Sequence, residues 1–164
     1  MRQHTSFNLP PGAQIPVIAD THGLLRPEAI ERLVGAPLIL HAGDVDRPAI
    51  LDELNEIAPT VVVRGNIDRG NFGNLLPLTE TVDISGHLIY LRHIVENIDI
   101  DPSAAGFQLV ISGHSHKPSI ETHNSITYLN PGSIGPRRFK LPISMAILTV
   151  SNSALTPQLI ELDV

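Results

Sequence analysis

The chain has 164 residues, of which 42% are hydrophobic and 17% are charged, a balance typical of a folded globular protein. A single domain over residues 1–164 is expected, with residues 1–14 forming a flexible or irregular N-terminal arm. The formal net charge of −6 and the 4% aromatic content argue against an extended nucleic-acid surface. Cysteine is absent, which excludes disulfides and thiolate metal sites.

Membrane and targeting signals are not found in the sequence. No segment approaches the roughly 18 uninterrupted apolar residues of a membrane helix, so no membrane partner is expected. The first eleven residues are mixed and polar, without the apolar centre of a signal peptide, which favours a cytoplasmic location. A homodimer is compatible with a domain of this size, and the sequence leaves the oligomeric state open.

The first half of the chain alternates predicted strands and helices. Apolar runs predict strands over residues 15–19, 37–40 and 60–63, and proline-initiated helical patterns predict helices over residues 27–34 and 48–57. The order is βαβαβ, which implies parallel strands joined by crossover helices.

The second half of the chain is richer in strands. Residues 80–84 and 87–95 are predicted to pair around a Ser85-Gly86 turn, and a short helix is expected over residues 102–106. Further strands are predicted over residues 109–112, 126–130, 144–150 and 158–162. The fold class is therefore α/β, with parallel strands early and antiparallel strands late.

Short polar clusters follow four of these strands. They are Asp20-Thr21-His22, Gly43-Asp44, Gly65-Asn66 and Gly113-His114-Ser115-His116. Ligands bind beyond the carboxyl ends of strands in open α/β sheets, so the clusters are expected to converge. Alternation along an extended segment is expected to aim Asp20 and His22 to one side. The glycines are expected to let the backbone come close to a bound ion.

The remaining histidines divide by position. Odd positions of the predicted strand over residues 87–95 share one face, which leaves His93 at the far end of that strand. His41 is expected to pack behind the site, while His4, His87 and His123 are expected to be solvated or structural.

The residue types of these clusters indicate a transition-metal site. Imidazole and carboxylate ligands without thiolate suit manganese, iron, zinc, nickel or cobalt. Two such ions about 3.5–4 Å apart can clamp both the attacking and the leaving oxygen of a phosphoryl transfer, with a metal-bound hydroxide as nucleophile.

The ordered clusters resemble the signature of the calcineurin-like metallophosphoesterase superfamily. Within it, the phrasing around Asp20, Asp44 and Asn66 and the segment over residues 129–135 resemble the small single-domain phosphodiesterases of bacteria and archaea. The resemblance covers about residues 15–150, most of the chain. It implies an αββα sandwich, with two mixed sheets flanked by helices.

The resemblance also implies roles for individual residues. One metal would be held by Asp20, His22 and His116, the other by Asn66, His93 and His114, with Asp44 as the bridge between them. Two divalent ions are implied, Mn²⁺ first and Ni²⁺, Fe²⁺, Zn²⁺ or Co²⁺ as alternatives, acting on a small phosphate ester. Asp44, Asn66 and His114 would then carry catalysis.

The sequence departs from the superfamily at two positions. Ile67 replaces the histidine that usually follows the asparagine, which leaves Asp68 or a metal-bound water as the leaving-group acid. His93 is followed by Ile94 where the family has glycine. Arg137 and Arg138 either reach a substrate phosphate or are solvent-exposed charges.

Two alternatives to a phosphodiesterase remain. The same fold serves a retromer-subunit-like, non-catalytic scaffold, and the missing histidine at Ile67 fits that interpretation. A large exposed apolar patch away from the clusters would favour the scaffold. A nuclease is the third hypothesis, restricted by the acidic charge to short or cyclic nucleotides.

Overall fold

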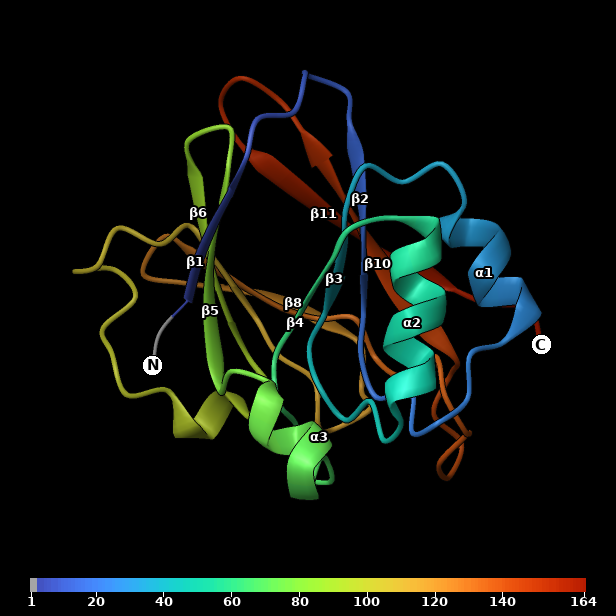
Figure 1. Ribbon diagram of the computed structural model, residues 1–164. Coiled ribbons are helices and arrows are strands. Elements are labelled where there is room, and N and C mark those ends of the chain that lie inside the picture. The colour runs from blue at the N-terminus through green and yellow to red at the C-terminus, as the bar shows by residue number, and fades with distance from the viewer. Residues whose placement is uncertain (1–2) are drawn as a thin grey trace.

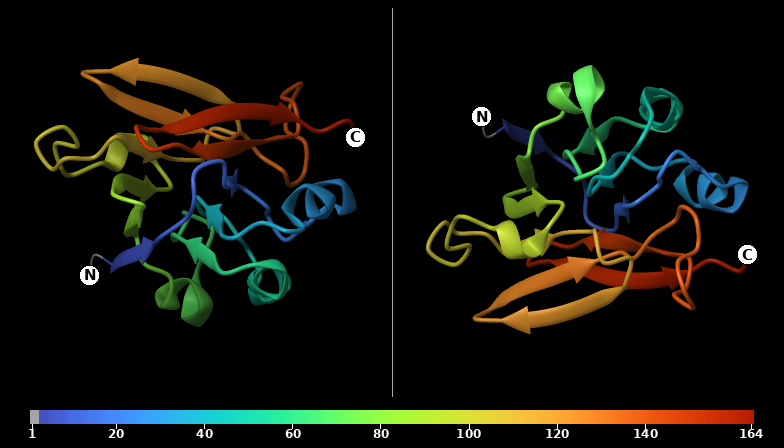
Figure 2. Two further views of the ribbon diagram at one scale, coloured as in Figure 1. Left: turned by 90° about the horizontal axis from the view of Figure 1, so that it is seen from above. Right: turned by 90° about the horizontal axis from the view of Figure 1, so that it is seen from below.

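The computed structural model describes residues 3–164, which form two β-sheets packed face to face (Figure 1 and Figure 2). The five-stranded sheet has the order β11-β10-β2-β3-β4, and the six-stranded sheet has the order β1-β5-β6-β7-β9-β8. Both sheets contain parallel and antiparallel pairs, which confirms the expected α/β sandwich of mixed sheets.

The five-stranded sheet contains the predicted βαβαβ unit. Strands β2 (Gln14–Ile18), β3 (Ile39–His41) and β4 (Thr60–Val62) are parallel, and α1 (Pro27–Leu33) and α2 (Pro48–Ile57) connect them. Proline stands in the first turn of both helices, where its missing N–H costs no helical hydrogen bond. The antiparallel strands β10 (Ser144–Val150) and β11 (Leu155–Glu161) complete the sheet beside β2.

The six-stranded sheet is less antiparallel than expected. Strands β5 (Thr79–Ile84) and β6 (His87–Arg92) form the predicted antiparallel pair, and β8 (Ser119–His123) pairs in the same way with β9 (Ile126–Asn130). However, β6, β7 (Leu109–Ile111) and β9 run parallel to one another. The expectation of antiparallel strands throughout the second half is wrong for these three, because the loop over residues 93–108 returns the chain after β6 and the strand β8 returns it after β7.

Alternating side chains along the strands build separate apolar layers. Ile15, Val17 and Leu40 face the layer between the sheets, whereas Ile18 and Ile39 face α1 and α2. This period of two is the one expected for strands buried on both faces. Figure 2 shows both helices against the outer face of the five-stranded sheet.

A loop, not a helix, covers the outer face of the six-stranded sheet. The segment between β6 and β7 contains the 3₁₀ turn η1 (Val95–Asn97), and its Ile98 and Phe107 pack against Tyr90 of β6. The short helix expected over residues 102–106 is a series of turns instead. The backbone N–H of Phe107 returns to the carbonyl of Pro102, and Gly106 with φ +82° turns the chain back.

The expected irregular arm over residues 1–14 is wrong for residues 3–7, which form a strand, whereas residues 8–13 are irregular. Residues 1 and 2 lie outside the described residues, but β1 (Gln3–Phe7) pairs in parallel with β5 at the edge of the six-stranded sheet. The hydroxyl of Thr5 donates to Glu80 over 2.6 Å, and Phe7 packs against the layer between the sheets. The sequence analysis also did not predict β8 or the helix α3 (Gly70–Leu75). In residues 3–164, no helix combines the length and the apolar character needed to span a membrane.

Candidate metal centre

The predicted ligands lie in loops at one end of the sandwich, the lower end in Figure 1. The loops after β2, β3 and β4 of the five-stranded sheet carry Asp20, His22, Asp44 and Asn66. The loops after β6 and β7 of the six-stranded sheet carry His93, His114 and His116. Parallel strands end at the same edge, so both sheets deliver polar side chains to one place.

Asp20, His22 and His116 form a first ligand group, whose ligand atoms all lie within 4.8 Å of one another. The Nε2 atoms of His22 and His116 are 3.2 Å apart. Oδ1 of Asp20 lies 3.5 Å from Nε2 of His116 and 3.7 Å from Nε2 of His22. Three donor atoms thus converge on one point from two strands of different sheets.

The carboxylate of Asp20 indicates that this group fits a cation. Its Oδ2 accepts the backbone N–H of His114 over 3.1 Å, while its Oδ1 is buried without a hydrogen-bond partner in the described part of the chain. A buried carboxylate oxygen with no partner is costly in free energy. A divalent ion held by Asp20 and the two imidazoles would satisfy it.

Asp44, His93 and His114 form a second ligand group, again with ligand atoms within 4.8 Å of one another. Asn66 completes it, because its Oδ1 lies 3.0 Å from Nε2 of His93 and 3.0 Å from Nδ1 of His114. Nδ1 of His93 donates to the carbonyl of Ala42 over 2.7 Å. That contact leaves Nε2 of a neutral His93 with only a lone pair, facing the Asn66 oxygen and, at 3.2 Å, Oδ2 of Asp44. A metal ion fits between such converging acceptors.

Asp44 lies between the two groups. Its Oδ2 is 3.2 Å from Nε2 of His93 and 3.6 Å from Nε2 of His22, which is the position that a bridging carboxylate requires. Burial opposes the charge on Asp44, but the hydrogen bond and the charge of His93 outweigh it and lower the pKa of this carboxyl. Burial also lowers the pKa of His93, and here the carboxylates of Asp44 and Asp20 outweigh it and raise that pKa.

The backbone at the ligands is unusual. Asp20, His22, Asp44, His114 and His116 all have positive φ, between +44° and +73°. The left-handed region costs a non-glycine residue about 1–2 kcal/mol, and such strain concentrates at functional sites. Strand alternation is therefore not what aims these side chains, because β2 ends at Ile18 and β7 at Ile111, before the ligands.

Glycines make room for the ligand side chains. A Cβ on Gly65 would collide with the side chain and backbone of Asp44, and a Cβ on Gly113 would lie 2.9 Å from Oδ2 of Asp20. A Cβ on Gly43 would lie 2.9 Å from Nδ1 of His93. The missing side chains at these glycines therefore let the ligand-bearing loops pack closely on one another.

Asp68 is not placed to protonate a leaving group. Its side chain is buried, and its two oxygens accept the backbone N–H groups of Asp44, Val45, Asp46 and Gly65 over 2.8–3.1 Å. The carboxylate therefore holds the loop after β3 against the loop after β4. The backbone N–H of Ile67 donates to Oδ1 of Asp44 over 3.0 Å, so this segment orients the bridge position. The only sequence signal for the role of Asp68 was the presence of a carboxylate three residues after Gly65.

His41 packs behind the site, as expected. It is fully buried, its Nδ1 accepts the N–H of Gly43 over 3.1 Å, and its Nε2 donates to the hydroxyl of Thr21 over 3.0 Å. Desolvation by burial and, after it, the nearby His93 lower the pKa of His41 to about 3. His41 thus stays neutral and positions the loops on either side of it.

The two arginines that follow β9 have different surroundings. Arg137 donates to the carbonyls of Leu141 and Val164, so it fastens its loop to the C-terminal segment. Burial lowers the pKa of His116, and the charge of Arg138 contributes to that lowering. Asn130 and Ser133 form hydrogen bonds with backbone atoms of the surrounding loops.

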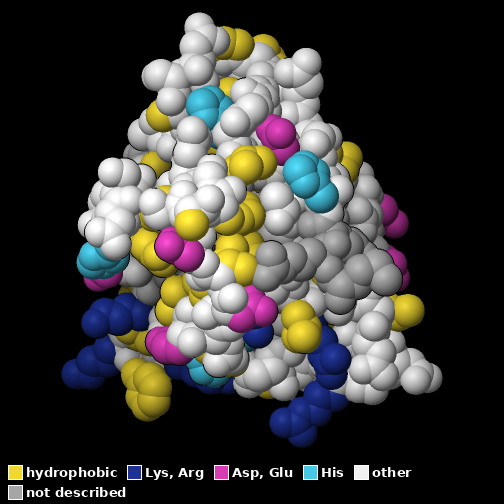
Figure 3. Space-filling model, turned by 90° about the vertical axis from the view of Figure 1, so that its left-hand side faces the viewer, with side chains coloured by type: hydrophobic (Ala, Val, Ile, Leu, Met, Phe, Trp, Pro, Cys, Tyr) yellow, Lys and Arg dark blue, Asp and Glu magenta, His cyan; other side chains and the backbone are white. Residues whose placement is uncertain are grey.

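Basic side chains surround the ligand end of an acidic protein. Lys and Arg residues gather along the lower end of the molecule in Figure 3, the end at which the ligand loops lie, although the net charge is −6. Clustered positive charge raises the local concentration of anions and speeds their arrival.

Comparison with known proteins gives a consistent match. Residues 14–153 match the family described as the calcineurin-like phosphoesterase superfamily domain. A probable metallophosphoesterase of Methanocaldococcus jannaschii is 35% identical over 144 residues, 79% of this chain and 73% of that protein. The probable metallophosphoesterase YsnB of Bacillus subtilis is 32% identical over 148 residues, 85% of this chain and 86% of that protein.

Solved structures share the fold. A predicted phosphoesterase from Streptococcus pneumoniae TIGR4 aligns with a TM-score of 0.69 at 25% identity, covering 91% of this chain and 89% of that chain. Vps29 of Chaetomium thermophilum aligns with a TM-score of 0.72 at 19% identity, covering 92% and 97% of the two chains. Vps29 of Entamoeba histolytica complexed with zinc aligns with a TM-score of 0.69 at 22% identity, covering 90% and 98%. The two Vps29 likenesses concern the fold alone.

Proposed function

Because this chain belongs to the calcineurin-like phosphoesterase superfamily, we propose that it is a phosphodiesterase that hydrolyses small phosphate diesters with two divalent metal ions. The observation that carries the proposal is the position of Asp44, whose Oδ2 lies within 3.6 Å of a histidine from each ligand group. A bound metal pair supplies Lewis acidity and activates water at neutral pH. Mn²⁺ is the proposed metal, because imidazole, carboxylate and carboxamide ligands suit it.

The candidate ligands divide into buried residues and residues that a substrate can reach from solvent. Asp20, Asp44 and His116 are buried and fix the geometry of the centre. Asn66 and His114 are exposed, so a substrate phosphate reaches their side of the second group from solvent. We assign to Asn66 and His114 the orientation of the substrate phosphate against the centre.

The leaving group receives no side-chain acid from position 67. Ile67 has no proton to give, and Asp68 is occupied by four backbone N–H groups. The rate should therefore depend steeply on the acidity of the leaving alcohol, with aryl esters hydrolysed faster than alkyl esters.

The scaffold alternative is tested by turnover and not by metal content. A Vps29 of the same fold is complexed with zinc, so bound metal alone does not separate an enzyme from a scaffold. The two most exposed large apolar side chains among residues 3–164 belong to separate segments: Phe139, 93% exposed, lies in the loop after β9, and Leu75, 82% exposed, ends the helix α3. The buried Oδ1 of Asp20, which has no hydrogen-bond partner within residues 3–164, supports a bound ion in an enzyme and in a scaffold alike, so only turnover decides between them.

The deciding experiment measures hydrolysis of bis-p-nitrophenyl phosphate and p-nitrophenyl phosphate by chelator-stripped protein. Mn²⁺, Ni²⁺, Zn²⁺ or Mg²⁺ is then added back. Metal-restored turnover with faster diester hydrolysis supports the proposal, and Asp44→Asn and His114→Ala should each abolish it. Asp52→Asn on the exposed face of α2 is the matched control. Absence of turnover with every metal, despite two ions bound per chain, would favour the scaffold.

A further inference from the structure

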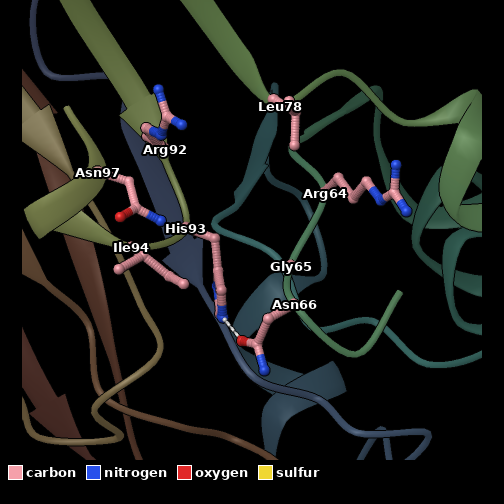
Figure 4. A pocket seen from close by; sticks show the side chains of 8 residues that line it. All are labelled: Arg64, Gly65, Asn66, Leu78, Arg92, His93, Ile94 and Asn97. Carbon is pink, nitrogen blue, oxygen red and sulfur yellow. Dashed lines mark hydrogen bonds between the residues drawn. The ribbon is translucent and has the colours of Figure 1, made fainter. Parts of the chain in front are cut away.

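Two pockets open onto the second ligand group. The first has a volume of about 230 Å³ and is lined by Asn66 and His93, as Figure 4 shows. The second has a volume of about 330 Å³ and is lined by Gly113 and His114. Asn66 Oδ1 lies 3.0 Å from the imidazoles of both His93 and His114, so a lining residue of the first pocket is next to a lining residue of the second.

The segment over residues 94–97 divides the pockets. Ile94 and Asn97 line the first pocket, whereas Val95 and Glu96 line the second. The η1 turn therefore acts as a partition that begins directly after the ligand His93. A phosphorus atom held at the second group would have one pocket on each side, and a phosphate diester has one organic group for each.

The first pocket has two apolar side chains in a wall that also contains two arginines. Leu78, 57% exposed, and Ile94 face it from opposite sides. Each of its two arginines has a partner elsewhere: Nε of Arg64 donates to the carbonyl of Asp68 over 3.0 Å, and Nη1 of Arg92 lies 3.5 Å from Oδ1 of Asp99. Figure 4 shows the side chain of Arg64 directed away from His93. This pocket suits an apolar or planar group.

The second pocket is rich in hydrogen-bond acceptors. Glu96 and Glu121 supply two carboxylates, and Ser119 and Tyr128 supply hydroxyls. Glu121 is 65% exposed and lies 3.2 Å from His123, which also lines the pocket. Acceptors of this density complement a group that carries hydroxyls or an ammonium, and they repel a second anion.

We propose that the two pockets are subsites for the two ester groups of an asymmetric phosphate diester. The first pocket holds an apolar or aryl group, and the second holds a hydroxyl- or ammonium-bearing group. This inference rests on the proposed function and names the class of substrate for it.

The test blocks each pocket separately. Asn97→Trp fills the first pocket and Ser119→Trp fills the second, while Gln158→Trp on the exposed face of β11 is the control. Binding of phenyl phosphate and of phosphocholine to the metal-loaded protein is measured by titration calorimetry. Asn97→Trp should weaken phenyl phosphate about tenfold and spare phosphocholine, and Ser119→Trp should do the reverse.

Turnover adds a second readout. p-Nitrophenyl phosphorylcholine should need both pockets and p-nitrophenyl phosphate only the first, so Ser119→Trp should lower kcat/KM about tenfold for the diester alone. If a tryptophan variant does not fold, Leu78→Ala and Glu121→Gln replace it. Glu121→Gln should then raise KM for p-nitrophenyl phosphorylcholine about threefold without changing that for p-nitrophenyl phosphate.

The outcomes separate the two proposals. The subsite assignment would be overturned if each tryptophan variant weakened the binding of phenyl phosphate and of phosphocholine equally. It would also be overturned if neither variant changed either affinity, even with normal wild-type turnover. No turnover of either ester by the wild-type protein, with the crossed binding pattern intact, would remove the phosphodiesterase and leave the two subsites established.

Discussion

The carboxylate of Asp68 accepts a hydrogen bond from the backbone N–H of Asp44, with Oδ2 3.1 Å from the nitrogen. This bond and three others to the same carboxylate fix the loop on which the bridge position lies. A residue that superficially resembles a proton donor is thus an anchor for the metal centre.

Replacing Asp68 by asparagine tests this anchor. Asp68→Asn puts an NH₂ group against backbone donors, so we expect a loss of about 1–3 kcal/mol in the free energy of unfolding. Thermal unfolding of metal-free protein should show a Tm lower by roughly 2–10 °C, and calorimetry should show weaker Mn²⁺ binding. Asp52→Asn should change neither. An unchanged Tm with a changed dependence on leaving-group acidity would instead make Asp68 the acid.

The close approach of Gly65 to Asp44 gives a second prediction. Gly65→Ala should displace the Asp44 side chain, because the added Cβ collides with its Oδ1 and its backbone nitrogen. We expect fewer than two metal ions per chain in elemental analysis and loss of metal-dependent hydrolysis. Gly12→Ala is the control, since Gly12 has φ +88° but open space around it and should cost only about 1 kcal/mol of stability. Two tightly bound ions in Gly65→Ala would contradict the packing argument.

His41 makes the stability of the metal-free protein depend on pH. Its pKa is about 3 when folded and 6.5 in the reference state, so between these values the unfolded chain binds a proton that the folded chain does not. Stability is therefore fully present above pH 6.5 and falls as the pH is lowered, by about 1.4 kcal/mol per unit for this group.

The variant His41→Gln lacks this titrating group, so its comparison with the wild type gives the contribution of His41 to the pH dependence of stability. Guanidinium unfolding at pH 7.5 and pH 5.5 should show the stability advantage of the wild type over His41→Gln shrinking by about 1.4 kcal/mol at the lower pH. The exposed His123→Gln is the control. A wild-type advantage equal at both pH values would mean that His41 takes up its proton in the folded protein.

A fourth prediction concerns the free-energy cost of burying Oδ1 of Asp20 without a hydrogen-bond partner. In Asp20→Asn the buried charge is removed while the carboxamide oxygen can still accept the N–H of His114. The metal-free variant should be at least as stable as the wild type, but it should lose the rise in Tm on addition of Mn²⁺. A metal-free variant less stable by more than about 2 kcal/mol would show that the carboxylate is needed for folding itself.

Much of the fold was predictable because its signals are local. The apolar runs before Asp20, Asp44 and Asn66 and the prolines at Pro27 and Pro48 mark the βαβαβ unit clearly. Strand β1 was missed because its polar sequence, from Gln3 to Phe7, is ordered by pairing with β5 and not by its own pattern. The parallel pairing of β6, β7 and β9 depends on the path of the loop after β6 and of the strand β8 after β7, which no periodicity encodes.

The ligand groups were predictable as residue types but not as geometry. Asp20 and His22 do converge with His116, yet positive φ values and not strand alternation direct them. The role of Asp68 depends on four backbone donors from two loops, and the partition between the pockets depends on a 3₁₀ turn after His93. Such contacts appear only when both sheets are assembled.

The assembly of each ligand group from both sheets has a mechanical consequence. His22 and His116 are 94 residues apart in sequence and belong to loops of opposite sheets, so an ion that they share is a crosslink across the sandwich. A crosslink that closes so long a loop restricts the unfolded chain strongly. Metal loading should therefore slow the separation of the two sheets at the ligand end. It should protect amides of β2 and of β7 from hydrogen exchange to a similar extent.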